Sequence, residues 1–375
     1  MTNERKQREV SSVPITVLTG FLGSGKTTLL NHLIQLPEMA RSLVIVNEFG
    51  KIGLDHNLVV HSEEDGIIEM SSGCLCCTFR GDLANTLRDA PGRFARGGEV
   101  WFDRVVIETT GLADPAPILV TLMTDPKLAR RYYLDGVITA IDTVNGNNTL
   151  NHHTESVKQA AMADRLLLTK TDMAEQAALD GLRHRLRHLN PGAPQITSEH
   201  GAVDPELLFD AGLYDPKTKS LDVQNWLRAE AYEGAYQDEP GANAAEPGGQ
   251  AVDRHDANIR SVCITIDEPV SSEAVERWIE RLLASRGGDF LRIKGILNVN
   301  ELDGPVVIHG VQHIFHPPVI LKTWPSDDHR SRIVFITRTI EEATLHDTLR
   351  EFTGLSAESS QGSPEVSDAL SAAGI

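Results

Sequence analysis

Short apolar runs alternate with helical patterns through the first two hundred residues of the chain. Several runs are apolar throughout rather than at every second position, which is typical of strands covered on both faces of a parallel sheet. The runs predict strands at residues 15–18, 43–46, 104–107, 136–141 and 165–168, and the patterns between them predict helices at 27–36, 155–163 and 174–188. This alternation predicts a doubly wound α/β domain with a mainly parallel sheet.

The pattern is interrupted after Trp226 and returns at Ile259. The segment 232–258 has no periodicity and is rich in Gly, Ala and acidic residues, which predicts a flexible linker. Beyond it, strands are expected at 261–266, 290–299, 306–309 and 333–337, and helices at 271–283 and 341–352. We predict a P-loop domain at residues 11–225, a linker at 226–258, a smaller α+β domain at 259–353 and a disordered tail at 354–375.

A glycine-rich segment after the first predicted strand is the most specific motif of the chain. Residues 20–27 read Gly-Phe-Leu-Gly-Ser-Gly-Lys-Thr and fit the pattern G-x-x-x-x-G-K-[ST], between a strand and a helix. Glycines allow backbone amides to point at a phosphate, the Lys26 ammonium reaches the β- and γ-oxygens, and the Thr27 hydroxyl binds Mg²⁺. We expect a phosphate-binding loop made by Gly20, Gly23, Ser24, Gly25, Lys26, Thr27 and Thr28.

An acidic residue at the end of the third predicted strand extends this site. Glu108 stands where a second acid near Mg²⁺ belongs, and Gly111 lets a backbone amide approach the γ-phosphate. A buried acid followed by an ordinary turn is the alternative. The predicted catalytic residues are Lys26, Thr27 and Glu108, and the hydrolytic water has Glu108 or Asp55 as candidate partners.

The segment after the strand at 165–168 indicates which nucleotide base the protein binds. Thr169-Lys170-Thr171-Asp172 resembles the Asn/Thr-Lys-x-Asp signature of GTPases, in which the aspartate binds the guanine N1–H and 2-amino group and the lysine covers the ring. Adenine lacks these paired donors and would leave the carboxylate unsatisfied. Lys170 and Asp172 therefore favour GTP over ATP, with a surface turn as the alternative.

Three of the four cysteines lie together, at Cys74, Cys76 and Cys77. A C-x-C-C run presents two or three thiolates to one soft cation without closing a tetrahedral site, and an exchangeable position suits delivery better than storage. Two alternatives stay open, a redox disulfide between Cys74 and Cys77 and buried structural thiols. Cys263, in a predicted strand of the second domain, is expected in the core.

The overall charge narrows the range of partners. The chain has 375 residues, a formal net charge of -18 and a pI near 5.2. Such an acidic surface repels phosphate backbones and anionic lipids, so we expect neither nucleic acid nor a membrane as a partner. The first residues are polar, and no apolar run approaches the roughly 20 residues that cross a bilayer. We expect a cytoplasmic protein with reduced thiols.

Taken together, these segments resemble the CobW-like family of metal-handling GTPases, also described as zinc-regulated GTPase metalloprotein activators. The matching pieces are GFLGSGKTTLLNHLI at 20–34, VNEFGKIGLDH at 46–56, GCLCC at 73–77, ETTGLADP at 108–115 and LLTKTD at 167–172. The second domain looks like the CobW C-terminal domain. The resemblance implies a GTP-hydrolysing metallochaperone that binds zinc, or cobalt, at the cysteines and transfers it to a client apo-metalloprotein.

The resemblance also carries expectations for residues around the motifs. Glu48 is a candidate fourth metal ligand or an acid on the Mg²⁺ side, and Lys51 departs from the family because an acidic residue often stands there. The γ-phosphate is expected to order residues 47–56, which would link the nucleotide to the metal. The second domain is expected to recognise the client. For the oligomeric state, the alternatives are a monomer and a dimer that forms with nucleotide or metal.

Other functions fit parts of the pattern. A nucleotide-gated zinc buffer would use the same sites without a client, and an activator of a cobalt or iron enzyme would serve the cobalamin pathway or a nitrile hydratase. A small-molecule kinase would need neither the cysteines nor the segment 169–172. In the second domain, His309, His313 and His316 have a spacing compatible with a metal site, although scattered surface or core histidines are the favoured interpretation.

Overall fold

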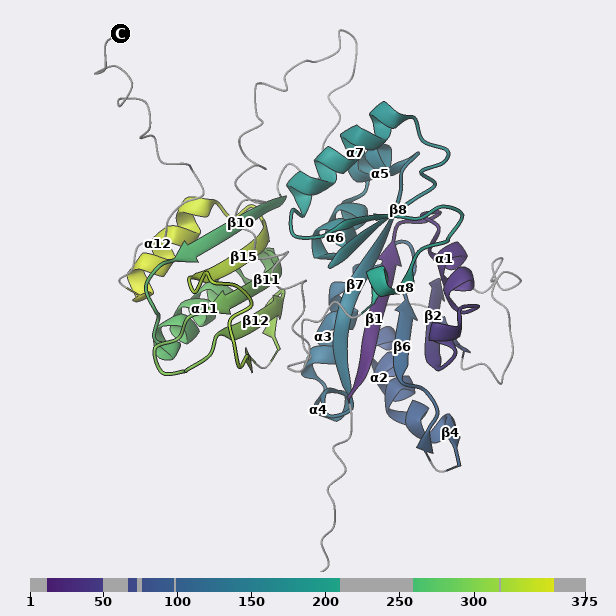
Figure 1. Cartoon of the computed structure of the whole chain (residues 1–375), viewed down its shortest axis with the longest axis horizontal. Helices are drawn as coiled ribbons and strands as arrows, with labels where there is room; N and C mark the ends of the chain where they lie inside the picture. Colours follow the sequence, from purple (N-terminus) through teal and green to yellow (C-terminus); the bar gives the residue numbers. More distant parts are fainter. Residues whose placement is uncertain are drawn as a thin grey trace, which may run out of the picture.

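Two large sheets, each with its own helices, form most of the described part of the chain (Figure 1). The computed structural model describes residues 12–49, 67–72, 76–97, 99–209, 259–316 and 318–353, and it gives only the backbone for 47–49, 67–72, 76–82 and 352–353. The predicted linker and tail, together with the domain boundary at residue 225, lie outside these ranges. None of the described helices is long and apolar enough to cross a membrane.

The first sheet has seven parallel strands in the order β3-β2-β6-β1-β7-β8-β9. They are β1 (Val13–Gly20), β2 (Ser42–Phe49), β3 (Ile67–Ser72), β6 (Arg104–Glu108), β7 (Tyr132–Asp142), β8 (Arg165–Thr169) and β9 (Gln195–Thr197), beside a small hairpin of β4 (Ala95–Arg96) and β5 (Glu99–Val100). The predicted parallel sheet is confirmed. Its five predicted strands are all present, whereas the two outer strands, β3 and β9, are not foreseen by the sequence pattern.

Helices cover both faces of this sheet. They are α1 (Lys26–Leu33), α2 (Cys76–Arg93), α3 (Ala116–Thr124), α4 (Pro126–Ala129), α5 (Gly146–His152), α6 (Thr154–Met162), α7 (Gln176–Leu189) and α8 (Pro205–Leu208). In β1, Ile15 and Val17 lie in the core under α2, α3, α6 and α7, while Leu18 lies in the core under α1. A run without alternation therefore fills two cores. The helix α1 ends at Leu33, earlier than predicted, because Pro37 disfavours helical backbone just before it and starts a short 3-10 helix, η1 (Pro37–Met39).

The second sheet is antiparallel, with the order β10-β15-β11-β12-β13 and with β14 paired to β12. The elements of this domain are β10 (Ile259–Ile266), α11 (Ser272–Arg286), η3 (Gly287–Asp289), β11 (Phe290–Leu297), β12 (Val306–Val311), β13 (Ile314–Phe315), β14 (Val319–Ile320), β15 (Ser331–Arg338) and α12 (Glu342–Thr353). Both helices pack on one face, where Trp278 meets Phe335 edge-on with ring centroids 5.8 Å apart. The predicted α+β domain is confirmed. The strand β11 ends two residues early because Val299 pairs with Val270 instead.

The other face of the second sheet packs on the first domain. The strand β11 contacts α6 and β10 contacts α7, on the side of the first domain that also carries α3 (Figure 1). A charged group lies within this contact, since Asp164 accepts hydrogen bonds from Nη2 of Arg292 at 2.7 and 2.8 Å and another from Lys294. The apolar core of the first domain extends across the boundary and includes Ile259, Leu291, Val311 and Ile336.

Candidate functional site

The glycine-rich loop connects β1 to α1 at the carboxyl edge of the first sheet. Gly20 has a φ of +140°, and a Cβ atom there would lie 2.4 Å from the carbonyl oxygen of Ala140 in β7, so no larger residue fits. Gly25 has a φ of +87° and directly precedes α1, which begins at Lys26. The loop therefore turns tightly over the amino end of α1, whose unpaired amide groups favour an anion.

Lys26 folds back over this loop. It is 7% exposed, and its Nζ donates to the carbonyl oxygens of Gly20 at 2.8 Å and of Phe21 at 3.1 Å. Phosphate oxygens are stronger acceptors than carbonyl oxygens, so the ammonium gains by exchanging one for the other. The hydroxyl of Ser24 is also buried, and it makes no hydrogen bond with any residue that the structure describes. A buried cation and a hydroxyl with spare capacity together suit a phosphate.

Glu108 and Thr27 meet where two elements end. Glu108 closes β6 level with Leu18 of β1, and its Oε1 accepts a hydrogen bond from the Thr27 hydroxyl at 3.2 Å. The neighbouring Thr109 donates its hydroxyl to that of Thr19 at 2.8 Å, which fixes the end of β6 against β1. A carboxylate and a hydroxyl side by side are the hard oxygen donors that Mg²⁺ takes, so these residues fit a magnesium ion.

The segment after Glu108 lies directly on the glycine-rich loop. A Cβ atom on Gly111 would lie 2.6 Å from the backbone nitrogen of Leu22, so only glycine allows this approach. Thr110 is 7% exposed, and its hydroxyl finds no hydrogen-bond partner among the described residues. Thr110, directly before the segment 111–114, thus supplies a second buried hydroxyl that suits an oxygen-rich ligand.

Thr169 and Lys170 connect the end of β8 to its surroundings. The Thr169 hydroxyl donates to the carbonyl oxygen of Ser24 at 2.8 Å, which ties the predicted base segment to the glycine-rich loop. Lys170 has a φ of +58°, and its Nζ donates at 2.8 Å to Asp142, the last residue of β7. Burial disfavours the charge of Asp142, but hydrogen bonds from Lys170 and Asn145 outweigh burial and lower its pKa. The ammonium group of Lys170 is therefore held by a carboxylate that is ionised at neutral pH.

Asp172 remains accessible beside these ties. Its side chain is 34% exposed, and its carboxylate lies 3.9 Å from Nε2 of His200. Thr28, the second hydroxyl residue of α1, is exposed. Both residues are thus within reach of a ligand at the carboxyl edge of the sheet.

The cysteine segment begins at the same edge. The strand β3 leads into it, and by register Glu48 of β2 pairs with Ser71 of β3. Cys76 and Cys77 open α2, which the sequence pattern does not predict. Cys74, Lys51 and Asp55 lie outside the described residues, as do the side chains of Cys76, Cys77 and Glu48. Cys263 is buried in β10, as predicted.

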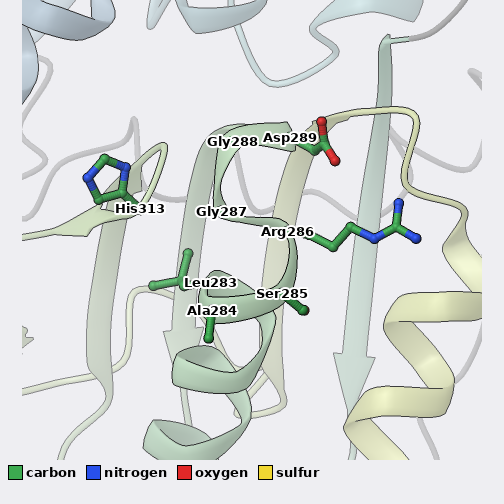
Figure 2. A pocket seen from close by; sticks show the side chains of 8 residues that line it. All are labelled: Leu283, Ala284, Ser285, Arg286, Gly287, Gly288, Asp289 and His313. Carbon is green, nitrogen blue, oxygen red and sulfur yellow. The ribbon is translucent and has the colours of Figure 1, made fainter.

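The three histidines of the second domain do not form one cluster. His309 and His316 lie together in the domain contact, with ring centroids 5.6 Å apart. His313 instead lines a shallow hollow of about 510 Å³ at the end of α11, and Figure 2 shows the side chains of Arg286 and His313 on opposite sides of the Gly287 turn. Within the described ranges, no three His, Cys, Asp or Glu side chains are grouped to hold a metal ion.

Two residues of the site escape the sequence pattern. Asp142 follows a predicted strand just as Asp172 does, so the rule that ligands bind at the carboxyl ends of parallel strands would have found it. Thr110 stands between two recognised motif residues and carries no signal of its own. With the glycine-rich loop, Glu108 and the Thr169–Asp172 segment on one edge, this arrangement is that of a P-loop GTPase.

Comparison with known proteins agrees with this class. Residues 14–197 match the nucleotide-binding domain described as CobW/HypB/UreG, and residues 259–353 match the C-terminal domain of the cobalamin synthesis protein cobW. The chain belongs to the CobW/HypB/UreG family, carries the CobW C-terminal domain and is a GTPase.

Individual relatives match between about half and nine tenths of the chain. The zinc chaperone YjiA of Escherichia coli is 33% identical over 336 residues, which cover 90% of this chain and 97% of that protein. The zinc-regulated GTPase metalloprotein activator 1 of Schizosaccharomyces pombe is 36% identical over 198 residues, 51% of this chain and 47% of that protein. The crystal structure of zinc-bound YjiA matches with a TM-score of 0.62 at 30% identity, over 91% of this chain and 99% of that chain.

Proposed function

We propose that this chain is a GTP-hydrolysing metallochaperone that carries zinc on Cys74, Cys76 and Cys77 and transfers it to a client apo-metalloprotein. The relatives named as zinc chaperones and as a zinc-regulated metalloprotein activator support zinc as the cargo. Thiolates bind cobalt as well, so the cysteines alone favour neither metal. The second domain is the proposed surface for the client.

The order of the strands carries this proposal. The strand β3, which leads into the cysteines, lies next to β2, and β2 lies next to β6, which ends at Glu108. Neighbouring strands are about 4.8 Å apart, so two strand spacings, roughly 10 Å, separate β3 from β6. By register, Val46 of β2 pairs with Glu108 on one side and with Glu69 of β3 on the other. A shared edge supports a metal site close to the γ-phosphate.

The nucleotide site is assigned to the residues that this edge brings together. Gly20, Gly23, Ser24, Gly25, Lys26, Thr27 and Thr28 are the proposed phosphate-binding residues. Thr27 and Glu108 would hold Mg²⁺, which neutralises charge on the β- and γ-oxygens when bound. Gly111 would direct its amide to the γ-phosphate, and Lys170 and Asp172 would bind guanine. Glu48, two residues beyond the level of Glu108 on β2, is the proposed fourth zinc ligand.

Zinc affinity tests the cysteine assignment. In the double variant Cys76→Ser/Cys77→Ser, the zinc affinity measured by competition with a chromogenic chelator should fall at least about 100-fold, so that stoichiometric binding is lost. The GTP affinity of this variant should change less than twofold. The buried Cys263 supplies the control, because Cys263→Ala removes a thiol far from the sheet edge and should bind zinc as the wild type does.

Affinity, rather than zinc content, has to be measured. A crystal structure of YjiA contains zinc even though one glutamate and two cysteines are replaced by alanine, so bound zinc alone does not identify the site. That structure matches this chain with a TM-score of 0.63 at 30% identity, over 91% of this chain and 99% of that chain. Wild-type affinity in the double variant would reject the cysteine site. A zinc buffer would keep every site, but no apo-metalloprotein would accelerate its GTP hydrolysis.

A further inference from the structure

The segment 111–114 is held from behind by two consecutive residues of α6. Nε2 of Gln159 donates to the carbonyl oxygen of Gly111 at 3.3 Å and to that of Ala113 at 2.9 Å. Next to it, Nζ of Lys158 binds the carboxylate of Asp114 at 3.0 Å. Three ties from one helix therefore define where this segment lies.

Gln159 is fully buried, at 0% exposure, and only the NH₂ group of its side-chain amide makes hydrogen bonds with the described residues. Its Oε1 accepts no hydrogen bond from the described residues, whereas its Nε2 makes both bonds to the segment. An apolar side chain of the same length would fill the space without leaving a buried oxygen unsatisfied. The amide of Gln159 therefore differs from such an apolar side chain in the two hydrogen bonds that it donates to the carbonyl oxygens of Gly111 and Ala113.

The same helix also reaches the glycine-rich loop. His153, directly before α6, stacks on Phe21 with ring centroids 4.4 Å apart and an interplanar angle of 29°. The two loops themselves meet where Gly111 touches Leu22. The contact is so close that a Cβ atom on residue 111 would clash with Leu22. The helix α6 therefore braces both sides of the contact between the phosphate-binding loop and segment 111–114.

We propose that Gln159 is a positioning residue for GTP hydrolysis, which holds Gly111 so that its amide can face the γ-phosphate. Gln159 itself touches neither the nucleotide nor the water. GDP has no γ-phosphate, so this role concerns GTP and its hydrolysis rather than nucleotide binding in general. The inference rests on the proposed nucleotide site but is independent of zinc delivery.

The variant Gln159→Met tests this role. It keeps the length and removes both donors, and it also removes the unsatisfied oxygen, so the fold should persist. We expect kcat for GTP to fall about tenfold, which corresponds to ~1.4 kcal/mol, with GDP affinity within twofold of the wild type. The affinity ratio between a non-hydrolysable GTP analogue and GDP should fall in the same direction, a change that a purely structural role would not produce.

Gln195 provides a matched control. Its Nε2 donates to the carbonyl oxygen of Arg183 at 2.9 Å, and its Oε1 is likewise buried without a described partner, but it lies at the start of the outer strand β9. Gln195→Met should leave kcat and the affinity ratio unchanged. Equal kinetics of Gln159→Met and Gln195→Met would overturn the proposal.

A third variant covers the case in which Gln159→Met does not fold. Lys158→Met removes the partly exposed tie to Asp114 and should lower kcat in the same way by a smaller factor, about threefold. An unchanged kcat in that variant would then count against the proposal. If the wild type bound neither GTP nor GDP, the proposed nucleotide site itself would be wrong. That result differs from an unchanged kcat in the variants, which would contradict only the role of Gln159.

Discussion

Thr169 shows how one short side chain connects the predicted base-binding segment to the glycine-rich loop. Its hydroxyl donates to the carbonyl oxygen of Ser24 at 2.8 Å and to that of Ile141 at 3.2 Å. The sequence predicts a base-binding segment here in spite of the unusual threonine in place of asparagine. In the structure, the hydroxyl of this threonine holds the predicted base-binding segment against the glycine-rich loop.

Substitution of Asp172 tests the predicted preference for guanine. Asp172→Asn replaces an acceptor for the two guanine donors by an amide that both accepts and donates. We expect GTP affinity to fall about 100-fold, and xanthosine triphosphate, which has a carbonyl in place of the 2-amino group, to become the tighter ligand. Calorimetric titration with both nucleotides measures the change.

The exposed Asp180 on α7 is the matching control for this substitution. Asp180→Asn should keep the preference of the wild type for GTP. Unchanged discrimination between the two nucleotides in Asp172→Asn would remove Asp172 from the guanine site.

The residues of the site differ in how visible they are in the sequence. Lys26 and Thr27 belong to one continuous motif, so local spacing reveals them. Gln159 acts on carbonyl groups 46 and 48 residues away along the chain, and a carbonyl carries no sequence signal. Contacts of this kind become visible only once helix and loop are packed together.

At the scale of elements, the interior strands were predictable and the edges were not. Strands β1, β6 and β8 have mainly apolar interiors and are buried at nearly every position, because both faces of the sheet are covered. The outer strand β3 reads Ile-Ile-Glu-Met-Ser-Ser, which is too short and too polar at its end to stand out. The helix α2 contains Pro91, a helix breaker by propensity, although its buried Leu83, Leu87 and Ala90 keep helical spacing.

The second domain shows a different limit. Its strands are buried on both faces, and the sequence pattern does not tell which face packs against α11 and α12 and which face packs against the first domain. The choice depends on the surfaces of α6 and α7 in the first domain, and even the end of α7, at Leu189, lies 70 residues before the start of β10, at Ile259. One signal in the sequence is Arg292 with Lys294, two cations at alternate positions of an otherwise apolar strand.

At the scale of the whole molecule, these cations form a buried ionic contact between the domains. Asp164 is 7% exposed and binds Arg292, Lys294 and the backbone nitrogen of Val137. Burial opposes the charge of Asp164, but Arg292 and Lys294 outweigh burial and hold its pKa well below the usual range. Burial lowers the pKa of the neighbouring His309 to about 4, despite the attraction of Asp164. This histidine is therefore neutral near pH 7, and the positive charges that compensate Asp164 come from Arg292 and Lys294.

Removing the carboxylate should loosen the docked domains. Asp164→Asn leaves two cations buried without a counter-charge, and we expect a loss of about 3–5 kcal/mol in the free energy of unfolding, measured with urea. Because the pKa of Asp164 is lower in the folded state, its stabilisation is complete above the pKa of the unfolded carboxyl and is lost as the pH falls. The difference between variant and wild type should be constant above about pH 4 and shrink below it.

An exposed ion pair supplies the comparison. Asp103 lies 3.2 Å from Arg41 and its side chain is 62% exposed, so Asp103→Asn should cost less than about 1 kcal/mol. Equal stabilities of the two variants would show that the buried contact contributes no more than a surface pair.

The account as a whole depends on communication between the nucleotide and the three cysteines across two strand spacings of one sheet edge. The most direct measurement is zinc affinity, determined by chelator competition, with the protein saturated by GDP or by a non-hydrolysable GTP analogue. We expect the two affinities to differ at least tenfold, and zinc to change the ratio of nucleotide affinities by the same factor, as linkage requires. Equal zinc affinity in both nucleotide states would contradict the account.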